Sequence, residues 1–404
     1  MSWTKIMLED ICISIADGDH QPPPKSDSGI PFVTISNITN TNKLDFTGTM
    51  FVSQEYYDNL NDKRRAHTGD ILYSVVGSFG IPVFIDKEQK FVFQRHIAIL
   101  RPDPKKIVSR FLYYMMLSRD FYMKADTVAL GAAQRTISLT ALRKMEMEVP
   151  PYNVQEKIVK ILKPFDDLIE NNQKQIKLLE EAAQRLYKEW FVDLHFPGYE
   201  NTKVVDGVPE GWIKNRADYF FDIMIGKTPP RTEQQWFVDG KSGIPWLSIS
   251  DMGNSEIFTF KTSEALTEEA IQKYSLKVVP DGTIFVSFKL TIGRVSIATT
   301  NMCTNEAIAH FYIKNDYQRA YTYCYLKNFQ YDTLGNTSSI SKAVNSKIIK
   351  AMPFIMPDEK MCWLFSKQVD PILNEIKNKQ LVSIKIEEAR DRLLPKLING
   401  ELEV

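Results

Sequence analysis

Residues 156–191 read EKIVKILKPFDDLIENNQKQIKLLEEAAQRLYKEWF, and this stretch decides the fold of the chain. Its apolar residues follow one another at alternating steps of four and three, the spacing of a helix that packs against a partner along one seam. The seam consists of Ile158, Leu162, Phe165, Ile169, Ile176, Leu179, Ala183, Leu186 and Trp190. Only Asn172 interrupts it with a polar side chain. The sequence therefore predicts one long helix that needs a second helix.

The chain repeats itself, and the repeat supplies that second helix. Matching segments recur in the same order and at a nearly constant offset. They are Gly29-Ile30-Pro31 with Gly243-Ile244-Pro245, Gly69 to Ser74 with Gly282 to Ser287, Pro150 with Pro357, Pro164 with Pro371, and Glu180-Glu181-Ala182 with Glu387-Glu388-Ala389. Two repeats are too few for a solenoid, so a pseudo-twofold dimer within one chain is the more natural arrangement. The two long helices are then expected to run antiparallel.

The second helix has a seam with a polar middle. Transferring the first seam by the repeat offset gives Phe365, Val369, Ile372, Ile376, Lys379, Ser383, Ile386, Arg390, Leu393 and Leu397. In an antiparallel pair the two middles meet, so Asn172 is expected near Lys379 and Ser383. A buried polar site of this kind fixes the register of the helices at some cost in stability. The sequence leaves open the alternative that Lys379 extends its ammonium group out of the seam into water.

The expected fold class is α+β, with two pseudo-twofold-related mixed α/β globular domains separated by a long antiparallel two-helix coiled coil. Strands are predicted at 32–36 and 91–100, and a helix is predicted at 109–123. The predicted division is a first globular domain at 1–150, the first spacer helix at 151–192, a Pro- and Gly-rich linker at 193–210, a second globular domain at 211–357 and the second spacer helix at 358–404.

Size and composition narrow the class of protein. The 404 residues suit two or three domains, and the 50 basic and 50 acidic side chains balance. That neutral sum is unusual for a general nucleic-acid binder, but local basic patches matter more than the sum. We expect neither a signal peptide nor a membrane span, and the four scattered cysteines suggest reduced thiols in a cytoplasmic protein.

Motifs that resemble catalytic sites are better explained structurally. Val149-Pro150-Pro151-Tyr152 is similar to the Asn/Asp-Pro-Pro-Tyr motif of DNA amino-methyltransferases, but Val149 cannot hydrogen-bond a base. Pro357-Asp358-Glu359-Lys360 is similar to a nuclease carboxylate-lysine cluster, yet it lies where the second helix begins, a place that favours acidic residues. The five histidines have no spacing typical of zinc ligands. We expect no catalytic residue and no metal site.

Polar and basic residues on the loops of both globular domains are the candidate DNA-binding set. Arginine and lysine suit guanine edges and phosphates, whereas glutamine and asparagine suit adenine. The set consists of His20, Gln21, Lys25, Arg64, Arg65, Arg95, His96, Gln134 and Arg135 in the first domain, and Lys227, Arg231, Lys289, Arg294, Asn305, Lys342, Asn345 and Lys347 in the second. Each could be an ordinary solvated side chain; as a set in both domains they favour binding.

Four features resemble the specificity subunit of type I restriction-modification systems, over essentially the whole chain. They are Asp17-Gly18-Asp19-His20 before Gly29-Ile30-Pro31-Phe32, Gly226-Lys227-Thr228-Pro229 before Gly243-Ile244-Pro245-Trp246, the Val149-Pro150-Pro151 junction before Gln155-Glu156-Lys157-Ile158, and Leu186 to Asp193 at the end of the first helix. The junction at Met356 to Lys360 departs from the family pattern.

The resemblance implies a non-catalytic DNA-recognition role. Each globular domain would read one half of an asymmetric bipartite target. The helices would set the half-site spacing and dock two modification (methyltransferase) subunits, which restriction subunits join. S-adenosylmethionine, ATP and Mg²⁺ would be bound by those partners and not by this chain. The alternatives are an enzyme of the fused DNA methyltransferase or nuclease type, and a coiled-coil scaffold that does not bind DNA.

Overall fold

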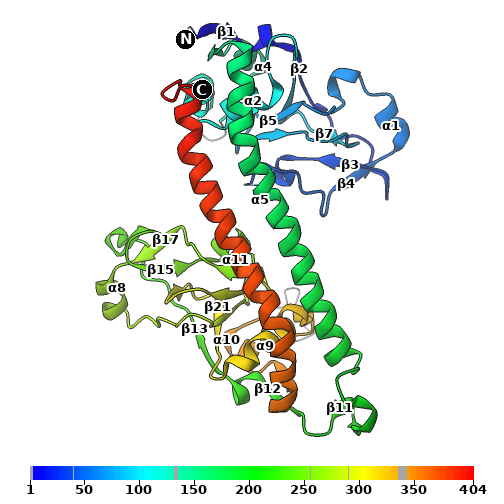
Figure 1. The fold of residues 1–404 in the computed structure, drawn as a ribbon, viewed down its shortest axis with the longest axis vertical. Coiled ribbons are helices and arrows are strands. Elements are labelled where there is room, and N and C mark those ends of the chain that lie inside the picture. The colour runs from blue at the N-terminus through cyan, green and yellow to red at the C-terminus, as the bar shows by residue number, and fades with distance from the viewer. Residues whose placement is uncertain (1–2, 40, 132–134, 255, 290, 335–343) are drawn as a thin grey trace. The chain divides into compact units, whose positions relative to one another are not determined.

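The computed structural model describes residues 3–39, 41–131, 135–254, 256–289, 291–334 and 344–404. The chain forms two compact units: unit 1 comprises Met1–Asp167 with Ile386–Val404, and unit 2 comprises Leu168–Lys385. Each unit therefore contains part of both long helices, α5 (Tyr152–Tyr187) and α11 (Glu359–Ile398), drawn in green and in orange to red in Figure 1. Within the described ranges, no helix combines the length and apolarity that a membrane crossing needs.

In the part of unit 1 that the structure describes, three small sheets and four short α-helices accompany the segments of the long helices. A four-stranded sheet has the order β2 (Cys12–Asp17), β8 (Ile97–Pro102), β5 (Ile71–Ser74), β6 (Pro82–Phe84). A three-stranded sheet has the order β4 (Met50–Val52), β3 (Ile30–Val33), β7 (Val92–Phe93), and β1 (Thr4–Met7) pairs with β9 (Glu146–Val149). The helices are α1 (Gln54–Asp58), α2 (Ser109–Leu117), α3 (Arg119–Val128) and α4 (Leu139–Arg143).

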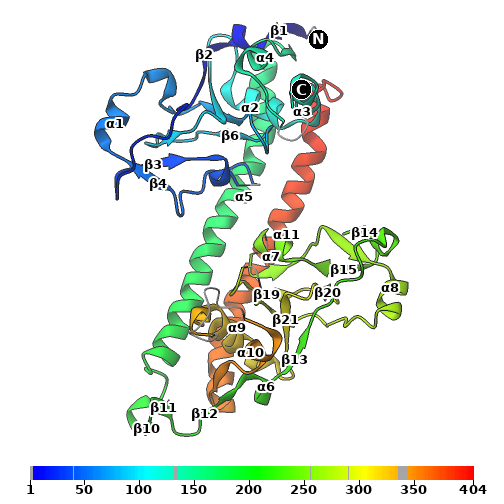
Figure 2. The same cartoon turned by 180° about the vertical axis from the view of Figure 1, so that it is seen from behind.

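Unit 2 has two larger sheets, whose strands Figure 2 shows grouped together. One has the order β13 (Asp222–Ile225), β21 (Ile308–Tyr312), β18 (Ile284–Ser287), β19 (Val295–Ala298), β16 (Phe258–Thr259). The other has the order β14 (Phe237–Asp239), β17 (Glu264–Leu266), β15 (Ile244–Leu247), β20 (Cys303–Thr304). The described part of unit 2 also has two two-stranded sheets. In one, β12 (Ile213–Arg216) pairs with β22 (Pro353–Met356), and in the other, β10 (Val204–Val205) pairs with β11 (Val208–Pro209). The short helices are α6 (Ala217–Phe220), α7 (Ile249–Asn254), α8 (Glu268–Lys273), α9 (Arg319–Asn328) and α10 (Ser346–Lys350).

The sequence repeat is a repeat of topology. The order β2-β8-β5-β6 in unit 1 corresponds to β13-β21-β18-β19 in unit 2, and β4-β3-β7 corresponds to β17-β15-β20. The pair β1-β9 corresponds to β12-β22, and each pair leads into a long helix. The predicted α+β class, with mixed sheets and helices in each half, is confirmed.

Three predicted elements are wrong in extent. The strand predicted at 32–36 ends at Val33, because Thr34 caps a 3₁₀ turn at Ile35–Asn37. The helix predicted at 109–123 is two helices, because Ser118 adopts an extended conformation and its Oγ accepts a hydrogen bond from the Phe121 amide, which starts α3. The strand predicted at 91–100 is also two strands. β7 pairs with β3 and β8 pairs with β2 and β5, so the chain changes sheets at residues 94–96.

The buried cores show that the long helices run antiparallel within each unit. In unit 1, Ile158 and Leu162 of α5 share a core with Leu394, Leu397 and Ile398 at the end of α11. In unit 2, the end of α5 meets the start of α11: the rings of Tyr187 and Phe365 lie 6.4 Å apart between centroids. Also in unit 2, Asn172 lies earlier on α5 and contacts Ser383, which lies later on α11.

In the polar middle of the seam, Asn172 forms a hydrogen bond with Ser383. The Asn172 side chain is only 5 % exposed, and its Nδ2 donates to Ser383 Oγ over 3.2 Å. Lys379 is instead half-buried and pairs with Glu375 on its own helix at 3.0 Å. Gln380 occupies the buried position beside it, where its Oε1 accepts from the Phe258 amide at 3.2 Å.

The residues of α11 that are buried therefore differ from the seam that the α5 spacing predicts for this helix. Within unit 2 it runs through Phe365, Val369, Leu373, Ile376, Gln380 and Ser383. Of the other predicted seam residues, Phe165, Leu179, Leu186, Trp190, Ile372, Ile386 and Leu393 are half-buried, and Ile169 and Ile176 are buried. The row shifts because α11 also packs against the sheet of its own unit, as the bond from Phe258 to Gln380 shows.

We expect Asn172→Ala to lower the free energy of unfolding of unit 2 by about 1–2 kcal/mol, because Ser383 Oγ would lose its partner in a buried seam. Replacing both residues with apolar side chains should be nearly neutral for stability. Urea denaturation of Asn172→Ala measures the loss, and Asn172→Leu, Ser383→Ala and the Asn172→Leu/Ser383→Ala double variant complete a double-mutant cycle. Additive losses in the double variant would show that the two side chains do not interact.

Candidate nucleic-acid interface

In unit 1, the loop that follows strand β2 is hydrogen-bonded to the end of strand β7. The Asp19 amide donates to the Phe93 carbonyl at 2.8 Å, and the Arg95 amide donates back to the Asp19 carbonyl at 2.9 Å. Gly18 makes this approach possible, because a Cβ there would lie 1.9 Å from the Phe93 carbonyl oxygen. The sequence Asp17-Gly18-Asp19 is thereby held rigidly beside the turn at residues 94–96.

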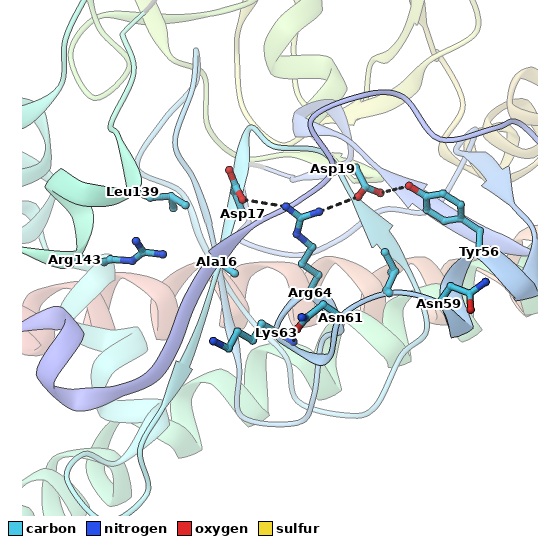
Figure 3. A pocket seen from close by; sticks show the side chains of 11 residues that line it. Ala16, Asp17, Asp19, Tyr56, Asn59, Asn61, Lys63, Arg64, Leu139 and Arg143 are labelled. Atoms are coloured by element: carbon cyan, nitrogen blue, oxygen red, sulfur yellow. Dashed lines mark hydrogen bonds and ion pairs between the residues drawn. The ribbon is translucent and has the colours of Figure 1, made fainter.

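Arg64 lies between the two carboxylates of this loop (Figure 3). Its Nη1 is 3.4 Å from Asp19 Oδ1, and its Nη2 is 3.6 Å from Asp17 Oδ1. The Tyr56 hydroxyl donates to the other oxygen of Asp19 at 3.0 Å. Burial, followed by the bond to Asp19, raises the pKa of Tyr56. We call Asp17, Asp19 and Arg64 the Arg64 cluster.

A second arginine holds the turn that carries Arg64. Arg101 donates to the carbonyls of Asp62 and Arg65 at 3.1 and 2.9 Å, and its Nη1 lies 2.6 Å from the Asp62 carboxylate. It also contacts Asp70, whose pKa is raised by burial although Arg101 opposes the shift. The hydrogen bond from Arg101 lowers the pKa of Asp62. The 3₁₀ turn η3 (Asp62–Arg64) is thus fixed to strand β8.

The Arg64 cluster faces a hollow of about 550 Å³. Its lining residues come from β2, the following loop, α1, η3 and α4: Ala16, Asp17, Asp19, Tyr56, Asn59, Leu60, Asn61, Lys63, Arg64, Leu139 and Arg143. Among the predicted residues, Arg64 lines the hollow, His20 contacts Asp17 at 2.7 Å and Arg95 adjoins Asp19 through the backbone. The hollow thus gathers part of the predicted set.

The other predicted residues of unit 1 are more scattered. Arg65 lies over the Tyr57 ring at 5.5 Å, and Arg135 pairs with Asp126 of α3 at 2.7 Å. Gln21 and Lys25 are exposed on the loop after His20, and His96 is half-buried in the turn. Gln134, like Lys342 of the second domain, lies outside the described residues.

Unit 2 has the same loop with different side chains. A Cβ on Gly226 would lie 2.1 Å from the Asn305 carbonyl oxygen, and the Lys227 amide donates to the Thr304 carbonyl at 2.9 Å. Lys227 thus corresponds to Asp19, and its Nζ donates to the Tyr274 carbonyl at 2.9 Å. The two units present opposite charges from the same backbone position.

Two other predicted cations of unit 2 act electrostatically on Glu306. The Thr228 hydroxyl donates to the Glu306 carboxylate, and this bond, with smaller contributions from Lys289 and Arg231, lowers the pKa of Glu306. Arg231 forms a two-bond pair with Glu264 at 2.7 and 2.8 Å and lies over the Phe237 ring.

The remaining predicted residues of unit 2 have local structural contacts. Asn345 caps α10 by accepting from two amides, and Lys347 is exposed on the first turn of that helix. Asn305 Oδ1 accepts from the Ala307 amide. Arg294 donates to the Ile249 carbonyl at 2.8 Å and lines a separate hollow with Lys177 and Lys327.

Sequence reasoning missed several residues at these loops. Asp17 and Asp19 belong to a sequence motif but not to the predicted set, and no sequence pattern marks Tyr56, Lys63 and Arg143. Residue type alone favours cations and amides as DNA contacts, although a carboxylate can accept a hydrogen bond from a base. Among the described residues, no group of three or more His, Cys, Asp or Glu side chains is placed to hold a metal ion.

Comparisons with known proteins agree with the duplicated fold. The family model for the type I restriction modification DNA specificity domain matches twice, over residues 2–181 and 209–385. The chain is 24 % identical to the type I restriction enzyme HindI specificity subunit of Haemophilus influenzae, covering 92 % of this chain and 95 % of the relative. It is 26 % identical to the putative MjaX specificity subunit of Methanocaldococcus jannaschii, covering 100 % and 94 %. A crystal structure of a type I restriction-modification S subunit from M. genitalium shares the fold, with a TM-score of 0.55, 15 % identity, and coverage of 98 % and 96 %.

The chain belongs to the family of type I restriction modification DNA specificity domains. It is a specificity subunit with two DNA-recognition domains, and the subunits of this class are non-catalytic. The family predicted from its sequence motifs is therefore confirmed.

A buried histidine below the Gly226 loop makes the stability of unit 2 depend on pH. His310 is fully buried, shares a hydrogen bond with Thr304 Oγ1 at 2.6 Å and contacts the Phe285 ring. Burial lowers the pKa of His310 to about 4, whereas an unfolded histidine titrates near 6.5. Between these values the unfolded state binds more protons than the folded one, so stability falls as the pH falls.

We expect unit 2 to lose up to about 3 kcal/mol of unfolding free energy between pH 6.5 and pH 4 through this one group. Urea denaturation across this range, followed by tryptophan fluorescence, measures the slope. His310→Phe should flatten the slope, because it removes the titrating imidazole. The variant should still fold, since Thr304 retains its bond to the Asn305 carbonyl. An equal slope in wild type and variant would contradict the assignment.

Proposed function

We propose that the two globular domains, residues 1–150 and 211–357, each read one half of an asymmetric bipartite DNA target. The observation that carries this proposal is the pair of loops at Gly18 and Gly226. Their backbones are anchored in the same way, but one presents Asp19 and the other Lys227. The two loops have similar backbone contacts but display opposite charges. This suits two domains that recognise different DNA sequences.

The candidate DNA-binding residues are proposed as contacts in two classes. Exposed cations such as Lys25, Arg95 and Lys289 suit phosphates. Arginines held by carboxylates, such as Arg64 and Arg231, suit base edges, because their geometry is fixed. The neutral net charge of the chain is compatible with this role if partner subunits supply much of the phosphate contact.

The partners of the chain follow from its class. We infer that α5 and α11 dock two modification subunits, which methylate adenine with S-adenosylmethionine, and that restriction subunits using ATP and Mg²⁺ join them. The chain itself would bind none of these cofactors. Acting on the cell's own DNA, the assembly would work in the cytoplasm.

Genome-wide mapping of methylated adenines tests the function directly. Cells that express the modification subunit with this chain should show one bipartite motif that is absent without the chain. Exchanging residues 1–150 for those of a relative should change only one half of the motif, and exchanging 211–357 should change only the other. A motif unchanged by either exchange would favour a scaffold, and methylation by the chain alone would favour an enzyme.

Lengthening the helices should change the spacing between half-sites. From Ile158 to Trp190 the first helix extends about 50 Å at roughly 1.5 Å per residue. Half-sites on one face of DNA recur about every 34–36 Å. Inserting seven residues into both helices, after Asn172 and before Ser383, adds about 10 Å and keeps the seam in phase. We expect about three more unspecified base pairs in the methylated motif; an unchanged gap would contradict the ruler role.

A further inference from the structure

We propose that the Arg64 cluster of unit 1 reads the major-groove edge of a G·C base pair. The proposal rests on the proposed DNA-reading role of unit 1 and specifies what part of the half-site one group of side chains recognises. Its basis is the arrangement of one guanidinium between two carboxylates at an open hollow (Figure 3).

The guanidinium of Arg64 is held in place but remains reachable. Its side chain is 35 % exposed, while those of Asp17 and Asp19 are 20 % and 9 % exposed. The loop that carries both aspartates packs at Gly18 against the Phe93 carbonyl, and Arg101 donates to the backbone of the turn that carries Arg64. An arginine oriented beforehand loses little conformational freedom when it binds, so its hydrogen bonds contribute more to recognition.

The charge of the cluster disfavours a phosphate. Two carboxylates oppose one guanidinium, and Asp19 also accepts from Tyr56. A phosphate approaching Arg64 would meet the negative charge of both aspartates. Lys63, which also lines the hollow, is exposed and, among the described residues, has no such carboxylate pair around it, so it is the better candidate for the backbone. Arg143, a further lining residue, is held by a 2.6 Å bond to the Ile15 carbonyl.

A G·C pair matches this combination of donors and acceptors. Guanine offers two adjacent acceptors, N7 and O6, which an arginine fork can contact together, and cytosine offers the N4 amino donor, which a carboxylate can accept. Adenine places an amino donor where guanine has O6, and that group would face the donors of Arg64. Arg64 beside Asp17 and Asp19 therefore distinguishes G·C from A·T.

The assignment is confined to the half-site of unit 1. In unit 2, Lys227 occupies the position that corresponds to Asp19. Arg231 of unit 2 is paired with Glu264 of strand β17 and not with a residue of the Gly226 loop. The same base pair at the corresponding place in the other half-site is not expected. The cluster therefore contributes to the asymmetry of the target.

The test uses the complete chain assembled with its modification subunits. The methylated motif is first mapped, and the half read by unit 1 is identified by exchanging residues 1–150. Binding is then measured on duplexes that carry 7-deazaguanine at each guanine of that half in turn, which removes N7 but keeps Watson–Crick pairing. One position should lose binding by roughly 5-fold or more, the lower end of the range for a bidentate contact, because N7 is one of its two acceptors and O6 remains.

Protein variants link that position to Arg64. Arg64→Ala and Arg64→Lys should relax specificity at the same base pair, and 7-deazaguanine there should cost Arg64→Ala nothing further. Asp17→Asn with Asp19→Asn should relax the same position. As a contrast, Lys63→Gln should weaken all duplexes equally and reduce the salt dependence of binding, as expected for a phosphate contact.

The possible results separate this inference from the proposed function. If no bipartite motif depends on the chain, the proposed function fails. If the motif exists but its unit 1 half specifies no G·C pair, or no 7-deazaguanine weakens binding, the Arg64 assignment is overturned while the function stands. Uniform weakening of all duplexes by Arg64→Lys would also overturn it. The substituted duplexes need no protein variant, so misfolding cannot obscure the result.

Discussion

Leu397→Asp is expected to unfold much of unit 1, although the residue lies near the opposite end of the chain. Leu397 is fully buried, and Leu394 and Ile398 beside it are less than 10 % exposed. All three belong to the core that includes Ile158 and Leu162. Truncation of such a leucine to alanine costs about 2–5 kcal/mol, and a buried carboxylate costs more.

Hydrogen exchange of the full chain measures this loss in unit 1 separately. Peptides covering β8 (Ile97–Pro102) should exchange much faster in Leu397→Asp, whereas those covering β21 (Ile308–Tyr312) of unit 2 should be little changed. Lys396→Ala is the matched control, because its side chain is exposed on the same turn. Normal protection of β8 in Leu397→Asp would show that the C-terminal turn is dispensable for unit 1.

Gly18→Ala is expected to abolish recognition by unit 1, with DNA binding by the assembled complex weakened at least about 100-fold, roughly 3 kcal/mol. An added Cβ would lie 1.9 Å from the Phe93 carbonyl oxygen, so the loop must leave strand β7 and lose the anchor between Asp19 and Phe93. Arg64 would then lack the carboxylates that orient it. Competition binding with specific and random duplexes measures the effect.

Two matched variants sharpen this experiment. Gly226→Ala should have the same effect through unit 2, because its Cβ would lie 2.1 Å from the Asn305 carbonyl oxygen. Gly48→Ala is the control, since a Cβ there meets no atom within 4 Å, and only its positive φ opposes the change. Specific binding by Gly18→Ala equal to that of Gly48→Ala would mean that the loop does not position the reading residues.

Part of the candidate interface could be foreseen from residue types and part could not. The residue types of Arg64, His20 and Arg95 predict polar or basic loop side chains, and the structure places all three at or beside one loop. Asn345 and Arg135 are also residue types that suit DNA contacts. However, Asn345 caps helix α10, and Arg135 pairs with Asp126. Residue type does not show whether a side chain makes contacts within the fold or is free to contact DNA. The difference depends on neighbours that are distant in the sequence.

The sequence by itself determined the repeat, the two long helices and the family. These depend on local periodicity and on the order of motifs, and both can be read along a single chain. It also indicated that Asn172 interrupts the seam. Only the tertiary structure decided that Ser383 and not Lys379 is its partner, since α11 also packs against the sheet of unit 2 and turns Gln380 inward. Only the tertiary structure placed Leu397 in the core of unit 1 and Arg64 between Asp17 and Asp19. These contacts join residues that are far apart in the chain, and burial and charge pairing act through space.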